Sequence, residues 1–418
     1  MKVYKFGGAS VKDAEGVRNV ANVLKLTNTT DALIVVSAMG KMTNALEKIV
    51  SDYFKDKASY RQAESMLIDF HLPIIEDLFG SQAPPVIATV RDLIQELSQF
   101  LQRNKSKNHA FVYDQVVSYG ELISSVLLST YLEQIGYTNR LLDVRTCIQT
   151  DDNYRDAKVN WESTQQNILA QVSTNGITIT QGFLGAEQTH NFTTTLGREG
   201  SDYTAAIFAY ALNAEDVTIW KDVPGVLNAD PRHFDAPILL HHISYKEAIE
   251  LAFYGASVIH PKTLQPLQRK EIPLYVKSFL DPLAPGTRVG KGVALDPQTS
   301  CFILKKDLVL ISLSSLDFSF MMENHMGEVF KWLHQYKMKV ELIQNSAISF
   351  SVCIDNKYDH LEALLQKLRE KFKVRWNEDV TLLTVRHSSP KEAKALEKGK
   401  TVLLKQESRE TLQLVVKQ

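Results

Sequence analysis

The regular alternation of short apolar runs with amphipathic segments over residues 1–280 constrains the fold of this chain more than any other feature. The run Ala32–Ser37 is apolar at every position but the last, which is typical of a strand buried on both faces. The segment Asp13–Leu26 instead places apolar residues at helical spacing. The pattern predicts an α/β fold with an open, mostly parallel sheet sandwiched by helices. Ligands of such sheets bind beyond the carboxyl ends of the strands, so a site is expected in the loops that follow them.

The composition changes near residue 300. Residues 281–300 hold three Pro and three Gly, which is typical of a linker. Beyond them, residues 308–376 follow the order β-α-β-β-α-β of a ferredoxin-like α+β unit. A second, shortened copy over 381–416 lacks a final helix and strand, unless residues 301–304 supply an edge strand. We therefore expect an α/β domain at 1–280, a linker at 281–300 and two tandem α+β units at 301–418.

Charge and hydropathy disfavour several classes of protein. The net charge of −1 over 418 residues argues against a nucleic-acid binder that works through bulk positive charge. The longest apolar stretch, Ala32–Met39, is far shorter than the roughly 20 residues that cross a bilayer. The N-terminus shows no secretory signal, so we expect a cytoplasmic protein without nucleic-acid or membrane partners. HExxH, CxxC and GxSxG motifs are absent, which disfavours zinc and serine hydrolases.

The first predicted strand ends in Lys5-Phe6-Gly7-Gly8-Ala9-Ser10, just before a predicted helix. Consecutive glycines let backbone N–H groups approach an anion closely, and a helix start adds positive potential. Lys5 would add a point charge beside them. The same residues also fit a tight turn with a solvated lysine, so both interpretations stay open.

The segment Thr195–Asp202 is a polar, glycine-bearing loop that leads into an apolar helix. The planar guanidinium of Arg198 suits a carboxylate or a phosphate. Asp202 would then orient a cation, either Mg²⁺ or the Lys5 ammonium. Capping of the helix by Ser201 or Asp202 is the plain structural alternative.

Two further segments carry charged residues that fit either a ligand-binding role or a purely structural one. The loop after the predicted strand at 217–220 carries four of them, namely Lys221, Asp222, Asp230 and Arg232. They suit a nucleotide site or a solvated surface. Ser118–Glu121 precedes a helix expected at 121–134, where Glu121 either receives a substrate ammonium or lies favourably at the positive end of the helix dipole.

Taken together, these segments closely resemble the aspartate kinases of the amino acid kinase family. The matching segments, in family order, are KFGGASV at 5–11, VVSAMGKMTN at 35–44, SYGE at 118–121, QGFLG at 181–185, TTTLGREGSDYTA at 193–205, KDVPGVLNADPR at 221–232 and YGASVIHPKT at 254–263. The C-terminal units look like the ACT regulatory domains of that family. A match of this extent is specific in a way that no single motif is.

The resemblance implies a monofunctional enzyme with ATP and Mg²⁺ as cofactors. It would transfer the γ-phosphoryl group of MgATP to the side-chain carboxylate of L-aspartate, giving 4-phospho-L-aspartate at the start of lysine, threonine and methionine synthesis. The implied catalytic residues are Lys5, Arg198 and Asp202. The implied aspartate-binding residues are Ser37, Thr43, Glu121, Phe183, Arg198 and Ser201. The implied nucleotide-binding residues are Lys5, Gly7, Gly8, Ser10, Lys221, Asp222, Arg232, Ser257 and Val258, and no metal site built from protein ligands alone is implied.

The chemistry implied by the resemblance agrees with these residue types. A carboxylate with a pKa near 3.9 is ionised at neutral pH, so the nucleophile needs no general base. The obstacle is the repulsion between two anions, which positioning and charge stabilisation overcome. Pairing of Arg198 with the α-carboxylate and of Glu121 with the α-ammonium would select an amino acid over a simple acid.

Three positions depart from the family pattern. Glu199 stands where glycine is usual and adds a negative charge beside anionic substrates. Ser257 stands where lysine is common, and Leu227 where an aromatic residue is frequent. One nucleotide contact is therefore missing, and packing around the ribose or base is expected to be looser.

The expected regulatory region departs further. Asn324 replaces the usual glycine of the effector loop, and the segment where the family binds its effector holds Glu341, Gln344, Asn345 and Ser346. Our hypothesis is that this region mainly forms a homodimer, and that inhibition by an amino acid effector, lysine or threonine, is altered or weak.

Two other functions remain open at the level of sequence. One is a kinase of the same fold that acts on glutamate, acetylglutamate or uridylate. The other is a non-catalytic amino acid sensor, inactivated by Glu199 and Ser257.

Overall fold

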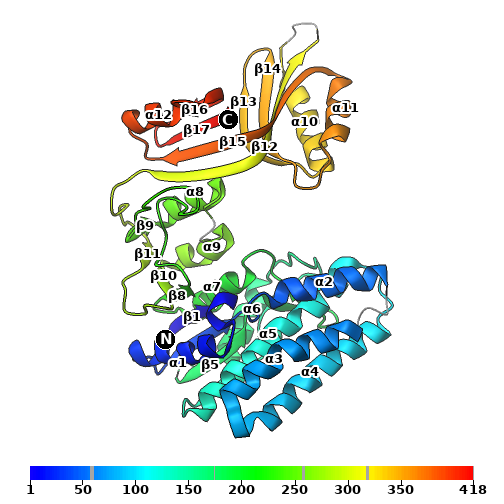
Figure 1. The fold of residues 1–418 in the computed structure, drawn as a ribbon, viewed down its shortest axis with the longest axis vertical. Helices are drawn as coiled ribbons and strands as arrows, with labels where there is room; N and C mark the ends of the chain where they lie inside the picture. The colour runs from blue at the N-terminus through cyan, green and yellow to red at the C-terminus, as the bar shows by residue number, and fades with distance from the viewer. Residues whose placement is uncertain (57–60, 174, 257–258, 317–319, 418) are drawn as a thin grey trace. The chain divides into compact units, whose positions relative to one another are not determined.

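The computed structural model describes residues 1–56, 61–173, 175–256, 259–316 and 320–417 (Figure 1). Contacts within the chain define two compact units. The first unit comprises Met1–Val226, Leu239–Ile249 and Val258–Pro297. The second unit comprises Leu227–Ile238, Glu250–Ser257 and Gln298–Gln418.

An eight-stranded sheet organises the first unit, in the order β3-β5-β2-β1-β8-β10-β11-β9. In that order the strands are Asn139–Leu142, Ile177–Gln181, Ala32–Val36, Lys2–Phe6, Val217–Lys221, Leu274–Ser278, Thr287–Gly290 and His242–Ser244. Every neighbouring pair from β3 to β10 is parallel, β10 and β11 are antiparallel, and β11 and β9 are parallel. The predicted open, mostly parallel sheet is therefore confirmed.

Helices cover both faces of this sheet. On one face lie α1 (Ala14–Leu26), α2 (Met42–Lys55), α3 (Arg61–Phe79), α4 (Ala83–Arg103) and α5 (His109–Gln134). Their apolar residues share one core with Tyr4 and Phe6 of β1. On the other face α7 (Gly200–Leu212) contacts β1, β2 and β8, and packs against α6 (Trp161–Gln171) and α9 (Pro261–Lys270). Because side chains alternate along a strand, Lys5 points to the face that α7 covers.

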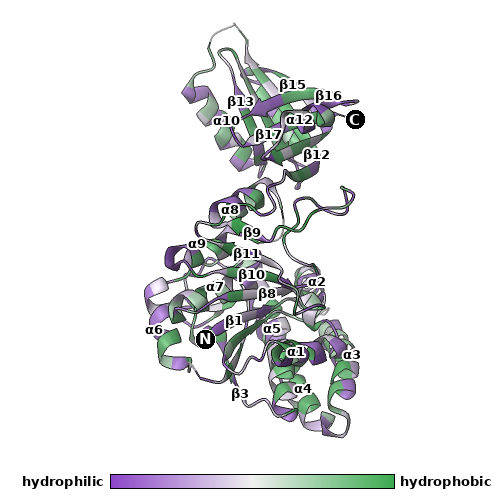
Figure 2. Ribbon diagram, turned by 90° about the vertical axis from the view of Figure 1, so that its left-hand side faces the viewer, coloured by the Kyte–Doolittle hydropathy of each residue, from purple (hydrophilic) through white to green (hydrophobic). Residues whose placement is uncertain are grey.

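Hydropathy follows these layers. Figure 2 shows hydrophobic residues along the central strands and a mixture of hydrophobic and hydrophilic residues on helix α4. All five residues of β2 are buried, whereas α4 buries Val90, Ile94 and Leu97 and exposes residues between them. The difference is the one expected for a strand covered on both faces and a helix covered on one.

A small sheet lies beside the main one in the first unit. Its order is β4 (Gln149–Thr150), β6 (Leu184–Glu187) and β7 (Thr193–Thr195). A short 3₁₀ helix, η1 (Gly8–Val11), follows β1, and η3 (Gly80–Gln82) and η4 (Val144–Thr146) form two more single turns. Helix α8 (Tyr245–Tyr254) follows β9.

The segment 281–300, expected as a linker, contributes a strand to the first unit. β11 pairs with β10 through registers such as Leu274 with Val289. Pro282, Pro285 and Gly286 lie in the loop that joins β10 to β11, a role that composition does not distinguish from a linker.

The second unit is built on a six-stranded antiparallel sheet in the order β13-β14-β12-β15-β17-β16. In that order the strands are Lys339–Asn345, Ser349–Asp355, Cys301–Ser315, Phe372–Arg386, Thr411–Lys417 and Thr401–Glu407. Helices α10 (Glu323–Gln335) and α11 (Leu361–Arg369) share a core with β12 and β14, and α12 (Pro390–Glu397) follows β15. The first expected β-α-β-β-α-β unit is thereby present.

The two ferredoxin-like units are not strictly in tandem. β12 and β15 each run through 15 residues and serve both units. Residues 301–305 of β12 pair with 382–386 of β15, while 308–315 pair with 372–380. The start of β12 thus supplies the edge strand that the sequence analysis left open. The first ferredoxin-like unit is therefore inserted, along the chain, into the second ferredoxin-like unit.

Two predicted helix starts were wrong. The helix expected at 121–134 begins at His109, where the side chain of Asn108 caps it, so Glu121 lies inside α5 and not at its positive end. Ser201 and Asp202 do not cap α7, because the N-cap residue is Glu199. The earlier start of α5 follows from the Asn108 cap, since its first residue His109 is exposed, whereas the first turn of α7 is buried against the core. No helix among the described residues combines the length and apolarity needed to span a bilayer.

Candidate functional site

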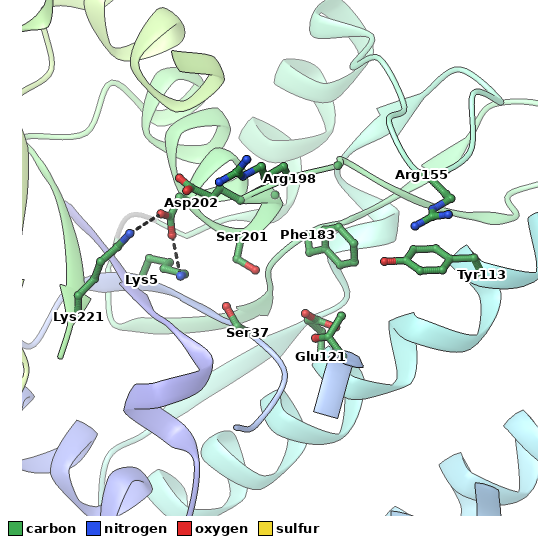
Figure 3. A pocket seen from close by; sticks show the side chains of 14 residues that line it. Lys5, Ser37, Tyr113, Glu121, Arg155, Phe183, Arg198, Ser201, Asp202 and Lys221 are labelled. Atoms are coloured by element: carbon green, nitrogen blue, oxygen red, sulfur yellow. Dashed lines mark ion pairs between the residues drawn. The ribbon is translucent and has the colours of Figure 1, made fainter. Parts of the chain in front are cut away.

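A cavity of about 430 Å³ lies at the carboxyl edge of the parallel sheet (Figure 3). The ends of β1 and β8 contribute Lys5 and Lys221, and the loops after β2 and β5 contribute Ser37 and Phe183. The start of α7 closes one side. The complete lining is Lys5, Ser37, Thr43, Tyr113, Glu121, Arg155, Phe183, Gly197, Arg198, Glu199, Gly200, Ser201, Asp202 and Lys221.

The structure brings together most of the residues singled out from the sequence. Nine of them line this cavity, namely Lys5, Ser37, Thr43, Glu121, Phe183, Arg198, Ser201, Asp202 and Lys221. They come from six separate segments, which the topology places at one edge of the sheet. This convergence is the arrangement expected of an open parallel sheet.

A buried ion-pair cluster lies at one end of the cavity. The carboxylate of Asp202 is 2.6 Å from Lys5 Nζ and 3.5 Å from Lys221 Nζ. Burial alone would raise the pKa of Asp202, but the two ammonium groups hold that pKa below its ordinary value. Asp202 therefore stays ionised. Figure 3 shows its ion pairs with Lys5 and Lys221 at the sheet edge.

The start of α7 is tightly constrained. Glu199 has a φ of +54°, in the left-handed region where glycine is favoured. A Cβ at Gly200 would lie 2.5 Å from the ring of Phe183, and one at Gly182 would lie 2.5 Å from Ser201. The two glycines thus allow the loop after β5 and the start of α7 to touch.

Glu199 also contributes charge. Its side chain lines the cavity, and burial raises the pKa of its carboxyl group, an effect that the nearby Lys221 ammonium opposes. Its Oε2 atom is buried without a hydrogen-bond partner among the described residues. This carboxylate oxygen therefore has an unmet hydrogen-bonding capacity.

Glu121 is a buried carboxyl group in the middle of α5. Its side chain is buried, and burial raises its pKa to about 8, while a hydrogen bond from the Ala38 backbone and the charge of Lys5 act in the opposite direction. Its Oε2 has no hydrogen-bond partner among the residues the structure describes. Gly120 permits this position, because a Cβ there would lie 2.7 Å from the Cβ of Ala38.

The glycine-containing turn after β1 has a structural role. A Cβ at Gly8 would lie 2.7 Å from the carbonyl oxygen of Gly40, so this glycine allows two loops to meet. Ser10 is buried, and its hydroxyl donates to the carbonyl of Trp220 at 3.2 Å. Gly7, Gly8 and Ser10 are not part of the cavity lining.

The remaining predicted nucleotide residues are not gathered in this lining. Asp222 is exposed, and Arg232 belongs to the second unit, where its guanidinium pairs with Asp230 at 2.6 Å. Ser257 and Val258 lie outside the described residues.

Sequence reasoning missed two residues of the lining, Tyr113 and Arg155. Tyr113 is eight positions before Glu121 on α5, and the mistaken helix start left it outside any expected site. Arg155 has a φ of +72° in the loop after β4. No motif marks either residue, and only the fold brings them to the cavity.

The cavity combines features suited to joining two anions. Lysines and the N-terminal end of a helix attract phosphate oxygens at one end. Arg198 and Glu121 offer the opposite charges that an amino acid zwitterion needs. The described residues that line the cavity include no histidine, which suits a reaction whose nucleophile is already ionised.

Comparison with known proteins identifies similar chains. The model of the amino acid kinase family matches residues 1–278. Lysine-sensitive aspartokinase 3 of Escherichia coli strain K12 is 32% identical over 357 residues, which cover 84% of this chain and 78% of that protein. The bifunctional aspartokinase/homoserine dehydrogenase 2 of Arabidopsis thaliana is 29% identical, and the match spans 42% of its length.

Crystal structures of E. coli aspartokinase III are also similar. The complex with aspartate and ADP has a TM-score of 0.83 and 29% identity, and the match covers 100% of this chain and 96% of that chain. The complex with lysine and aspartate has a TM-score of 0.81 with the same identity and coverage.

Proposed function

The chain belongs to the amino acid kinase family, among the aspartokinases, and on that premise we infer that it transfers the γ-phosphoryl group of ATP to the side-chain carboxylate of L-aspartate. The product is 4-phospho-L-aspartate. The observation that carries this inference is the single cavity in which the Lys5–Asp202–Lys221 cluster lies beside Glu121 and Arg198. It provides cations for phosphate and a complementary pair for an amino acid.

Lys5 stabilises the transferring phosphoryl group. Asp202 holds its ammonium at 2.6 Å, so the charge is already in place when the phosphate arrives. Charge that is oriented in advance needs no reorganisation during the reaction, and electrostatic stabilisation of this kind is the main protein contribution to phosphoryl transfer. Lys221 pairs with the other carboxylate oxygen of Asp202 and extends the positive surface towards the nucleotide.

Arg198 and Glu121 select the amino acid. The guanidinium binds the α-carboxylate, and the buried Glu121 carboxylate accepts the α-ammonium. A ligand that lacks either group leaves a buried charge without a partner, which costs more than the lost contact alone. Ser37, Thr43, Phe183 and Ser201 complete the wall against which the side chain of aspartate lies.

Mg²⁺ fits this site as a companion of the nucleotide. Among the described residues there is no group of three or more His, Cys, Asp or Glu side chains that could hold a metal alone. Mg²⁺ commonly binds nucleotide phosphates, one or two carboxylates and several waters. The unpartnered Oε2 of Glu199 is the carboxylate oxygen suited to it, with Asp202 nearby. When bound, the ion would reduce the negative charge of the phosphates.

The function is tested by measuring ATP consumption with a panel of amino acids. Hydroxylamine traps an acyl phosphate as a hydroxamate, so aspartate should give a hydroxamate, whereas glutamate and N-acetylglutamate should not. Hydroxamate formed faster from glutamate would assign the chain to another kinase. Binding of amino acids without ATP turnover would identify a sensor.

A further inference from the structure

Arg155 lies in the cavity but has no role in the function described so far. It comes from the loop after β4, and its guanidinium stacks on the ring of Tyr113 at 4.0 Å. Tyr113 in turn donates from its hydroxyl to Glu47 Oε1 at 2.7 Å. In Figure 3, Phe183 lies between Arg155 and the Lys5–Asp202–Lys221 cluster.

The backbone around Arg155 is held in an uncommon conformation. Its φ of +72° is unfavourable for a residue other than glycine, and such strain persists only where surrounding contacts enforce it. The enforcing contact is Asp114, which is fully buried and whose carboxylate accepts the Arg155 N–H at 3.0 and 3.2 Å.

Asp114 also fixes the loop that carries the other arginine of the cavity. Its carboxylate accepts the backbone N–H and the hydroxyl of Thr195, both at 2.8 Å. Thr195 is three residues before Arg198. One buried carboxylate therefore positions both arginine-bearing segments, and Arg155 and Arg198 lie on either side of Phe183 in Figure 3.

The guanidinium of Arg155 is available to a ligand. Its side chain is exposed at the cavity, and among the described residues no carboxylate forms an ion pair with it. The contact with Tyr113 limits its motion, and no carboxylate among the described residues occupies its planar set of N–H donors. A guanidinium held in this way suits a carboxylate.

We propose that Arg155 is a specificity-determining residue of the amino acid site, where it adds positive charge for the α-carboxylate of the substrate on the side of Phe183 opposite Arg198. The proposal rests on the function inferred above. The β-carboxylate must face Lys5, where the phosphoryl group is transferred, so the α-carboxylate is directed away from that end. Arg155 supplies positive charge there, beyond Phe183.

Replacement of Arg155 by glycine tests this role. Glycine adopts a positive φ without strain and keeps the N–H that Asp114 accepts, so Arg155→Gly removes the guanidinium while the loop conformation is retained. We expect the KM for aspartate to rise about tenfold, which is the order of one charge-assisted hydrogen bond, with kcat and the KM for ATP changed little. Arg155→Lys keeps the charge without the planar donors and should give an intermediate KM.

A modified substrate identifies the group that Arg155 contacts. L-aspartic acid α-amide keeps the ammonium and the β-carboxylate but lacks the α-carboxylate. The wild-type protein should have a higher kcat/KM for aspartate than for this amide. The ratio of the two kcat/KM values should fall about tenfold in Arg155→Gly, because that variant has already lost the contact with the α-carboxylate. Arg91→Gln on α4, which removes the same charge from an exposed position outside the cavity lining, is the matched control.

Three outcomes overturn the proposal: an unchanged preference for aspartate over the amide, an unchanged KM for aspartate, or a fall in kcat alone. Failure of the wild-type protein to phosphorylate aspartate would instead overturn the proposed function. The two failures are therefore distinguished by the wild-type measurement.

Discussion

Lys5 and Asp202 are charged residues that are almost completely buried. Their side chains are 10% and 3% exposed, and each neutralises the other at 2.6 Å. Removing one partner of such a pair leaves a buried charge that is costly, so these residues are coupled in stability as well as in activity. Asp202 also contacts Lys221, which limits that cost when Lys5 is lost.

Lys5→Ala should lower kcat by orders of magnitude while the protein remains folded. The ammonium acts on charge that develops during transfer, whereas Lys221 still neutralises Asp202. Steady-state hydroxamate assays and thermal unfolding measure the two effects. Lys2→Ala is the matched control, since Lys2 lies on the same strand and pairs with Asp216 outside the cavity. A mild loss of kcat would contradict the assigned role.

Arg198→Ala should chiefly raise the KM for aspartate. The guanidinium is assigned to the α-carboxylate, which is present in both the ground state and the transition state, so binding is lost more than turnover. Kinetics with aspartate varied at saturating ATP measure this effect. An unchanged KM would show that Arg198 does not recognise this carboxylate.

Glu121 makes aspartate binding pH-dependent. Its pKa is raised to about 8 by burial, so the carboxyl group is mostly protonated at neutral pH before substrate binds. The α-ammonium requires the ionised form. The KM for aspartate should therefore fall as the pH rises through about 6 to 8, and binding at neutral pH should release a proton.

Calorimetry in two buffers with different ionisation enthalpies measures that proton. Glu121→Gln, which cannot ionise, should abolish the release and give a high KM at every pH. Because the folded-state pKa lies above the unfolded value of about 4.5, the free energy of unfolding of the empty protein should also fall as the pH rises between these values. Binding without proton release at neutral pH would contradict this account.

Helix α7 is the element on which the site depends most. It presents Ser201 and Asp202 to the cavity from its first turn, and its buried side chains pack on the sheet between the strands that supply Lys5 and Lys221. Its start is determined by Glu199 in the left-handed conformation, at a position where the family resemblance implies a preference for glycine. The backbone geometry explains that preference, because only glycine adopts this φ freely.

Glu199→Gly and Glu199→Ala separate backbone strain from charge. Both variants remove the carboxylate, but only glycine relieves the positive φ, so the glycine variant should have a free energy of unfolding about 1 kcal/mol higher than the alanine variant. Chemical denaturation of the two proteins measures the difference. Equal stability would show that the turn relaxes when the side chain is lost.

At the level of the whole molecule, the second unit carries its own buried charges. The carboxylate of Glu341 is 6% exposed and pairs with Lys305 and Lys339, the latter at 2.7 Å. This residue lies in the segment where the family resemblance places the effector. Two lysines of the chain already neutralise it, so a free cationic amino acid must compete with them.

Inhibition by lysine should therefore be weak. Titration of lysine and threonine against the rate of aspartate phosphorylation measures it, and Lys305→Met should increase the sensitivity to lysine by freeing one oxygen of Glu341. Strong inhibition of the wild-type protein by micromolar lysine would contradict the expectation. The proposed homodimer stays a prediction, which analytical ultracentrifugation of the full chain would test.

The sequence by itself determined the parallel sheet and most of the cavity. Buried parallel strands require continuous apolar runs, and their carboxyl ends converge, so the loops at Lys5, Ser37, Phe183 and Lys221 had to meet. Local patterns at strand ends singled out Lys5 and Lys221, whereas Ser37 and Phe183 were implied by the family resemblance.

Tertiary structure alone decided the rest. Helix α5 starts at the Asn108 cap, and its packing in the core then brought Glu121 and Tyr113 to the cavity. Arg155 reached it because Asp114, 41 residues away in sequence, holds its backbone. Strands β12 and β15 are shared by both ferredoxin-like units, so residues 301–305 form an edge strand of the second ferredoxin-like unit. Such contacts join residues far apart in the chain, and no local pattern of residues encodes them.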